Sequence, residues 1–281
     1  MIAHRRFHYH ALAHALSGEL TRPVQHTIEV QAGTALPSTG GVGSSHVENF
    51  RVDEVVSFKR GYSHVSGSVK NEGGKVIHTT IATATLEGFN ILDVVTADRI
   101  VMRLSSSFEE PQAGQKPVET QVLVVGSKFE NLRIAWYLTD VELDHELFLN
   151  LRTFGAVRDS WKAKDVKLRQ IASETARALK RDDVKLPEQL EAHEHLFCSL
   201  VKEIHFQEPG FQKKVDRFTP AEVQRVGRHG IYVVDFGHVY LAEVLCRHGQ
   251  KTLTMIRVEL GSPNGGGLTG AEGSSNGEPP W

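Results

Sequence analysis

The sequence predicts an all-β protein of mainly antiparallel strands, with a core like that of a β-sandwich or jelly roll. About ten stretches rich in Val, Ile and Thr, which favour strands, are separated by short turns that contain Gly. One stretch, at about 158–182, instead has the spacing of an inserted amphipathic α-helix. A β-solenoid is the alternative, because residues 89–98 are weakly repeated at 130–140 with offsets of 41 and 43.

The first half of the chain holds strands whose alternating pattern is interrupted by Gly. The tetrapeptide Asn-Glu-Gly-Gly at 71–74 predicts a hairpin turn, because Gly adopts the positive φ angles that such turns need. The strands predicted here span residues 24–31, 53–69, 76–86, 94–108 and, after a polar loop, 120–125.

Residues 131–149 end in an alternation of apolar and acidic side chains, which predicts a strand with one buried face. Acidic residues at alternate positions suit Ca²⁺, but His145 and Leu151 stand where an EF-hand needs Gly and Glu. The pattern therefore favours the exposed face of an edge strand. The apolar members are Val141, Leu143, Leu147 and Leu149, and the acidic members are Asp140, Glu142, Asp144 and Glu146.

The helical stretch is the most basic part of the chain. Residues 158–186 contain nine Lys and Arg against five Asp and Glu, although the whole chain has a net charge of −2. This helix is a candidate contact element for an acidic surface or another subunit, and the other interpretation is a helix laid across the sheet. The candidate interaction residues are Lys162, Lys164, Lys167 and Arg169.

Strand patterns return in the second half, at 195–206, 230–247 and 252–260. From Gly261 onward the chain is rich in Gly, Ser and Pro, which predicts a frayed tail. An ordered terminal loop with Trp281 as a plug in a partner subunit is the alternative. The expected organisation is one β-rich domain at 1–260, with a helical insertion at 155–190, and a C-terminal tail at 261–281.

Composition excludes several classes of protein. The near-neutral charge argues against a nucleic-acid binder that works by bulk positive charge. No apolar run approaches the length of a membrane span, and the N-terminus lacks the apolar region of a signal peptide. The two cysteines, Cys198 and Cys246, are expected to be buried thiols in a reducing compartment. We therefore expect a cytoplasmic protein, with export that needs no cleaved signal as the alternative.

The histidines are the first candidate site. His8, His10 and His14 would share one face of a strand, so His8 and His10, with His46, could bind a divalent metal. This arrangement resembles that of the cupins, in which a His-x-His pair on a jelly roll is joined by a later His. The resemblance implies a metal-dependent enzyme, but His14 replaces the expected acid and the leading Gly is missing. A solvent-facing row of histidines is the favoured interpretation.

A second candidate site is acidic. Asp93 and Asp98 lie near Arg99, with Thr96 between them, in an otherwise apolar stretch. Such a group could serve acid–base chemistry, or it could bracket a turn between strands. The sequence contains no Walker-type phosphate-binding loop, His-Glu-x-x-His or Cys-x-x-Cys.

The leading functional hypothesis is a non-catalytic protein that acts through binding or self-assembly, as a homo-oligomer or with a protein partner. The alternative is the metal-dependent enzyme. A carbohydrate-binding module is the third hypothesis, and its stacking candidates are Trp136, Tyr137, Trp161 and Tyr240.

Overall fold

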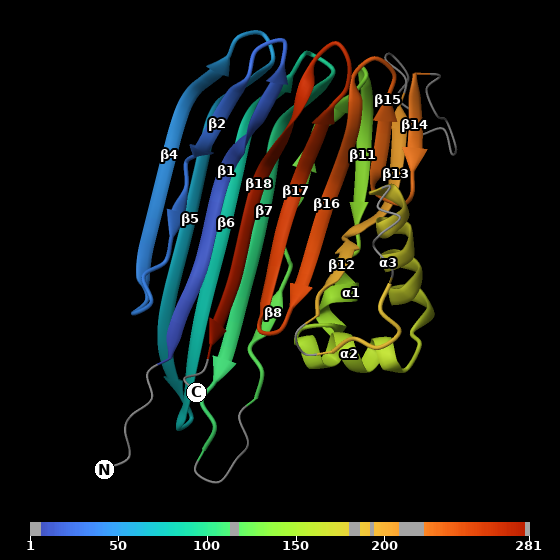
Figure 1. Cartoon of the computed structure of the whole chain (residues 1–281). Coiled ribbons are helices and arrows are strands. Elements are labelled where there is room, and N and C mark those ends of the chain that lie inside the picture. Colours follow the sequence, from blue (N-terminus) through green and yellow to red (C-terminus); the bar gives the residue numbers. More distant parts are fainter. Residues whose placement is uncertain (1–6, 113–117, 180–185, 192–193, 208–221, 279–281) are drawn as a thin grey trace.

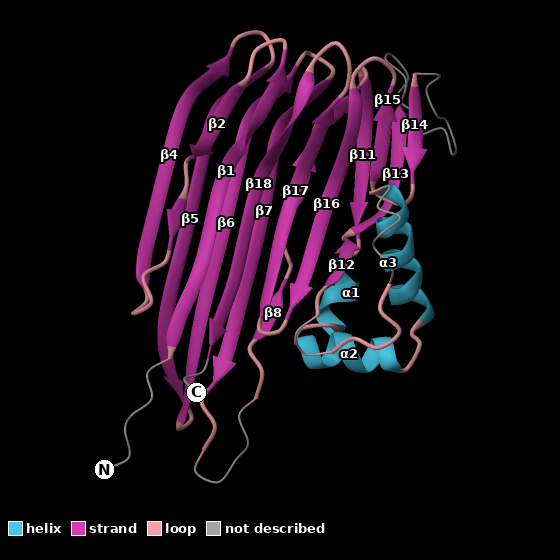
Figure 2. Cartoon of the chain, viewed as in Figure 1, coloured by secondary structure: helices cyan, strands magenta, loops and turns pink. Residues whose placement is uncertain are grey.

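A computed structural model gives the structure of the chain and describes residues 7–112, 118–179, 186–191, 194–207 and 222–278. The chain forms two antiparallel sheets, and the predicted all-β, sandwich-like class is confirmed. The strand pairs within both sheets are antiparallel, which rules out the β-solenoid alternative for the described residues. Figure 2 shows the sheets in magenta, with the helices gathered at one corner.

Sheet A is the layer nearer the viewer in Figure 1 and has the order β14-β15-β16-β17-β18-β1-β2. In addition, β12 pairs with β16, and β3 pairs with β1. The strands of sheet A are β1 (His8–Arg22), β2 (His26–Gln31), β3 (Thr34–Ala35), β12 (Leu196–Ser199), β14 (Val223–Val226), β15 (Gly230–Val233), β16 (Gly237–Arg247), β17 (Gln250–Leu260) and β18 (Gly265–Glu278).

Sheet B lies behind it and has the order β13-β11-β10-β7-β6-β5-β4. In addition, β8 and β9 pair with β7. The strands of sheet B are β4 (Gly41–Val52), β5 (Val56–Glu72), β6 (Lys75–Ile91), β7 (Val95–Glu109), β8 (Gln121–Leu123), β9 (Lys128–Glu130), β10 (Arg133–Ile134), β11 (Tyr137–Leu143) and β13 (Val201–Gln207).

The predicted hairpin turn is confirmed. Strands β5 and β6 pair as far as Glu72 and Lys75, and Gly73 and Gly74 form the turn with φ angles of 57° and 80°. Such angles are costly for a residue with a Cβ atom, which is why Gly stands at both positions. The turn fixes the register of the longest hairpin in sheet B.

The predicted single helix is wrong in its extent, because two helices with a break between them occupy the stretch. They are α2 (Phe154–Lys162) and α3 (Val166–Ala178). The break occurs at Lys164, which has a φ of 58°, and at Asp165, whose side chain accepts a hydrogen bond from the Leu168 backbone and caps α3.

The predicted strand at 131–149 is also wrong in its second part. Its strand β11 ends at Leu143, and a further helix, α1 (His145–Asn150), follows. Asp144 caps α1 by accepting a hydrogen bond from the Leu147 backbone, and this buried capping role removes it from the acidic row. Strand β10 pairs with β11 only at Tyr137 and Leu138, so at Asp140 and Glu142 the described pairing of β11 is with β13 alone.

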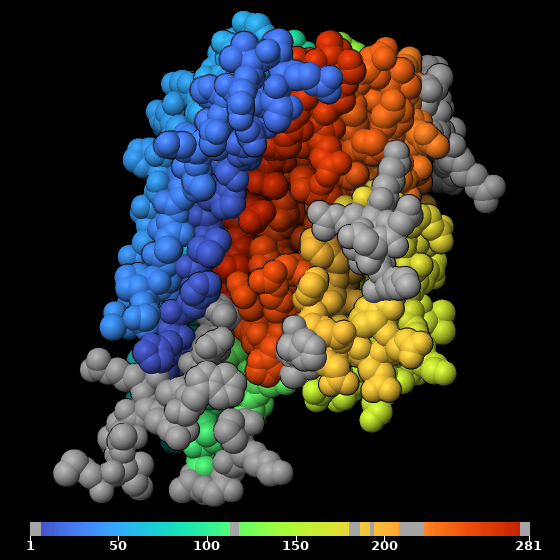
Figure 3. Space-filling view, in the orientation of Figure 1, coloured from blue at the N-terminus to red at the C-terminus, as the bar shows by residue number. Residues whose placement is uncertain are grey.

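The prediction of a frayed tail from Gly261 is wrong for Gly265–Glu278. This segment is β18, which pairs with β1 on one side and β17 on the other. Figure 3 shows it in red between the blue N-terminal strands and the orange strands of the second half. Trp281 lies outside the described residues.

The predicted strand at 195–206 divides between the two sheets. Strand β12 pairs with β16 in sheet A, and β13 pairs with β11 in sheet B. Leu200 lies between them, and its N–H donates to the carbonyl of Ala242 at 2.9 Å. The predicted strand at 230–247 also divides, because a turn at 234–236 separates β15 from β16.

Small side chains allow the two sheets to approach closely near the middle of the sandwich. A Cβ atom added to Gly273 on β18 would lie 2.2 Å from the Cε of Met102 on β7. Ser275 on β18 contacts the hydroxyl of Thr80 at 2.6 Å and that of Ser106 at 3.2 Å, so the hydroxyl groups buried between the sheets bond to one another.

Candidate functional site

A row of five alternating charges crosses the outer face of sheet B. Successive members are register partners on β4, β5, β6, β7 and β9, so they form a line across the strands. Their neighbours Leu86 and Ile100 are fully buried and face the opposite side, toward sheet A. We call this row the charge ladder, and its members are Glu48, Arg60, Glu87, Arg99 and Glu130.

The members of the charge ladder form ion pairs with one another. Arg99 donates to Oε1 of Glu87 from Nε at 3.2 Å and from Nη2 at 3.0 Å. Its Nη1 lies 3.6 Å from Oε2 of Glu130, and Nη1 of Arg60 lies 3.7 Å from Oε2 of Glu87. The hydrogen bond to Glu87 raises the pKa of Arg99, and the hydrogen bond from Lys128 lowers the pKa of Glu130.

The charge ladder lies in a concavity of about 620 Å³. The positive φ angles of Asn49 and Gly88, 54° and 63°, interrupt the regular strands at this place. A Cβ atom at Gly88 would lie 2.7 Å from Cγ of Lys59, so the stem of this lysine lies across the glycine. Besides the ladder, the lining residues are Asn49, Lys59, Gly88 and Asp98.

The predicted acidic site around Asp93 and Asp98 is divided. Asp93 forms a turn with Asn90, whose Oδ1 accepts a hydrogen bond from the Asp93 backbone at 2.8 Å. Asp98 accepts a hydrogen bond from Nδ2 of Asn131 at 2.5 Å and reaches the concavity. Arg99 pairs with Glu87 and Glu130 of the charge ladder and not with Asp93. The hydrogen bond with Asn90 therefore favours the interpretation that Asp93 brackets a turn.

The structure does not bring the predicted metal-binding histidines together. His8 and His10 are exposed on β1 in sheet A, whereas His46 is exposed on β4 in sheet B. His14 is buried beside Glu272, and burial lowers its pKa. In the described part of the chain, one group of side chains lies close enough together to share a metal ion, and it contains none of these histidines.

That group consists of Glu142, Glu203 and His205, on β11 and β13. A β-bulge between the two strands sets Lys202 and Glu203 opposite Glu142. The ammonium group of Lys202 lies 2.6 Å from Oε1 of Glu142 and already supplies a positive charge there. Because its members are largely exposed and one carboxylate is neutralised, we assign no metal to this group.

The four candidate interaction residues of the helical insertion divide into two pairs. Lys162 and Lys164 are exposed. Lys167 pairs with Asp144 at 2.6 Å, and Arg169 lies 4.7 Å over the ring of Trp161. Lys167 and Arg169 therefore hold the helices together, whereas the side chains of Lys162 and Lys164 are open to solvent.

The four aromatic candidates also have different surroundings. Trp136 is 66% exposed, in the turn between β10 and β11. Tyr137 is half-buried, while Trp161 and Tyr240 are almost fully buried and belong to the interior. Of the four, Trp136 is the ring most open to solvent.

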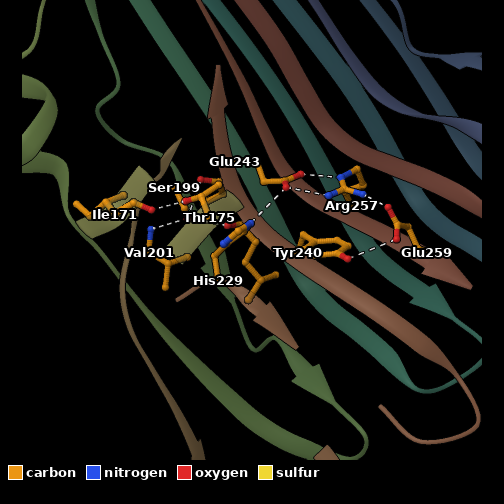
Figure 4. A network of polar contacts seen from close by, with 11 residues as sticks. Ile171, Thr175, Ser199, Val201, His229, Tyr240, Glu243, Arg257 and Glu259 are labelled. Atoms are coloured by element: carbon orange, nitrogen blue, oxygen red, sulfur yellow. Dashed lines mark hydrogen bonds and ion pairs between the residues drawn. The ribbon is translucent and has the colours of Figure 1, made fainter. Parts of the chain in front are cut away.

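A buried ionic network that the sequence does not reveal joins β16 and β17 (Figure 4). Arg257 donates to Oε2 of Glu243 from Nε at 2.7 Å, and Nε2 of His229 lies 3.3 Å from Oε1. Burial favours the protonated form of Glu243, but the bonds with Arg257 and His229 outweigh it and lower its pKa to about 2. Burial and the neighbouring Glu259 raise the pKa of Tyr240 to about 12.

The position of this network indicates a structural role. Glu243 and His229 are 4% and 0% exposed, and the backbone of His229 accepts a hydrogen bond from Leu241 where β16 exchanges β15 for β12 as its neighbour. The network thus gives both carboxylate oxygens of Glu243 and Nε2 of His229 a partner at a junction of three strands.

A second buried charge lies between the sheets. Lys251 on β17 donates to the carbonyls of Val122 at 2.9 Å and Arg152 at 2.7 Å, and burial lowers its pKa to about 8. Both cysteines are free and buried nearby, with Cys246 in register with Lys251. Lys251 therefore ties β17 to the segment that enters the helices.

In the part of the chain that the structure describes, no helix is long and apolar enough to cross a membrane. No curated protein and no solved structure matches the chain. One family model, described as "Domain of unknown function (DUF8256)", matches residues 7–247. This match spans both sheets and the helical insertion, and the chain belongs to that family.

Proposed function

We propose that the protein acts through binding or self-assembly, without catalysis, and that a second copy of the chain docks on the free edge of β4. The observation that carries this proposal is the length and openness of that edge. Strand β4 has 12 residues and is the last strand of sheet B, with β5 as its only partner in the described sheet. An edge strand presents backbone N–H and C=O groups that can pair with another chain.

The other sheet edges are shorter or better protected. The edge strands β2, β13 and β14 have 6, 7 and 4 residues, and β13 carries the bulge at Lys202. Strand β4 contains neither Pro nor Lys, the residues that commonly protect an edge. Its side chain Val42 is 71% exposed. Because Asn49 interrupts the strand, residues 41–48 are the segment best suited to pairing.

Charge favours contact between two copies. Strand β4 carries one Glu and one Arg, and the whole chain has a net charge of −2. Electrostatic repulsion between copies is therefore weak. Antiparallel pairing of β4 with itself gives a two-fold dimer, in which sheet B continues from one copy into the other.

Sedimentation velocity over a range of protein concentrations tests this proposal. We expect a dimer for the wild type and a monomer for Val42→Lys combined with Ser44→Lys, because two charged side chains would then line the edge. Val234→Lys is the control, since Val234 is 51% exposed but lies in the turn between β15 and β16. A monomeric wild type, or a double variant that dimerises as well as the control, would contradict the proposal.

A further inference from the structure

We infer that the concavity around the charge ladder binds a neutral, polyhydroxylated ligand, a carbohydrate, with Tyr62 as the ring against which a sugar stacks. This inference rests on the binding part of the proposed function and is independent of the β4 contact. Its basis is the chemistry of the lining, the internal compensation of its charges and the exposed ring beside them.

The lining of the concavity is unlike that of a pocket for apolar ligands. Small-molecule sites of roughly 300–1,000 Å³ are usually lined by hydrophobic and aromatic side chains. Here, in about 620 Å³, the described lining consists of charged residues, one Asn and one Gly. A ligand that fits this surface must therefore form hydrogen bonds over most of its own surface.

The charges of the lining favour a neutral ligand. The lining holds four carboxylates and three cationic groups. Glu87 already lies against both Arg60 and Arg99, so a charged ligand would have to compete with existing ion pairs. A hydroxyl group can donate to a carboxylate and accept from a guanidinium at the same time, without separating the pair.

The geometry of the charge ladder suits a ligand with several hydroxyl groups in a row. Neighbouring strands lie about 4.8 Å apart, so acceptors and donors alternate at this spacing from β4 to β9. The double contact of Arg99 with Glu87 and the 2.5 Å pair of Lys128 with Glu130 hold these groups in place. Such prior ordering reduces the entropy that binding would otherwise cost.

Tyr62 supplies the apolar contact that a sugar ring needs. It lies two residues after Arg60 on β5, on the same outer face, and is 39% exposed. Its register partner on β6 is Thr85, two residues before Glu87, so the ring borders the lining of the concavity. A tyrosine ring combines a flat apolar face with a polar end, which matches the C–H face and the hydroxyl groups of a sugar.

Native gel electrophoresis through gels that contain a neutral polysaccharide tests the inference, with a β-glucan, a xylan and a mannan as probes. We expect at least one polysaccharide to retard the wild-type protein, to the same extent at low and high salt. Tyr62→Ala should weaken this binding about tenfold through loss of stacking, whereas Tyr62→Phe should retain it. Glu87→Gln should weaken it as well.

Two controls separate binding in the concavity from binding elsewhere on the protein. Trp136→Ala removes the exposed ring in the turn between β10 and β11 and should leave binding unchanged. The Val42→Lys, Ser44→Lys double variant should still bind, which separates the concavity from assembly through β4. No retardation by any of the three probes, or loss with Trp136→Ala but not with Tyr62→Ala, would overturn the inference.

Discussion

At the scale of single residues, the buried charges of this protein depend on specific partners. Glu243 is 4% exposed and ionised because Arg257 and His229 contact its two oxygens. Removing a charge from such a group leaves the partner buried and unpaired, which usually costs more than the intact pair contributes. These residues therefore govern stability although they lie outside the concavity.

Glu243→Gln should lower the free energy of unfolding by about 3 kcal/mol near neutral pH. The pKa of Glu243 is about 2 in the fold, against a reference value of 4.5. Because the folded pKa is depressed, the stabilisation is fully present above about pH 4.5 and is lost as the pH falls toward 2. Urea unfolding between pH 2 and 7 measures both the loss and its pH dependence.

Glu259→Gln is the matched control, because Glu259 contacts the same Arg257 but has a side chain that is 52% exposed. Its effect should stay below about 1 kcal/mol. Equal losses from the two variants would show that burial does not distinguish the two carboxylates.

At the scale of elements, strand parity is the part of the sequence pattern that the structure preserves best. On β11, Thr139 is buried, Val141 and Leu143 pack against the core, and Glu142 is exposed on the other face. The same alternation continued in the sequence to Leu149, but there it occurs in α1. A period of two over a few residues does not exclude a helix, and capping by Asp144 decides between them.

Leu143→Asp should destabilise the protein by at least about 2 kcal/mol, because a charge would enter the inward face of β11. Glu142→Lys should change stability by less than about 1 kcal/mol, although it places a second ammonium group beside Lys202. Thermal melts followed by circular dichroism compare the two variants. If they melt at the same temperature, the assignment of faces on β11 is incorrect.

At the scale of the whole molecule, the distance between the sheets decides which residues β18 can contain. This strand is inserted between β17 and β1 and faces the middle of sheet B. A Cβ atom at Gly273 would collide with Met102 and would lie 2.9 Å from the carbonyl oxygen of Leu12. The high content of Gly and Ser in this segment predicts a tail when only the sequence is considered. In the fold, the same small residues are what allow β18 to pack closely against sheet B.

Gly273→Val should lower the free energy of unfolding by about 1–3 kcal/mol, because the added methyl groups force the sheets apart. Gly267→Val in the same strand is the control, since the nearest atom to its added Cβ, the Val258 carbonyl oxygen, lies 4.0 Å away. The control should change stability by less than about 0.5 kcal/mol. Chemical denaturation of both variants provides the comparison, and equally stable variants would argue against close packing at Gly273.

The candidate site shows the same division between local and tertiary information. The sequence predicts the turn at Gly73 and Gly74. If residues are counted back from this turn along both strands of the hairpin, Arg60 stands opposite Glu87. Glu48 and Glu130 join them through the β4–β5 and β7–β9 strand pairs. No turn motif in the sequence sets the register of these two pairs as clearly as the two glycines set that of β5 and β6. The pairing of Arg60 with Glu87 could thus be predicted, whereas the full charge ladder could not.

The sequence by itself determined the fold class, the β5–β6 turn and the inward parity of the strands, because periodicity and turn chemistry are local properties. Only the tertiary structure decided that β18 is an inner strand, that His8 and His46 lie on different sheets and that five charges form one row. The physical reason is that these features depend on strand order, register and the distance between sheets. Contacts between residues far apart in the chain set all three.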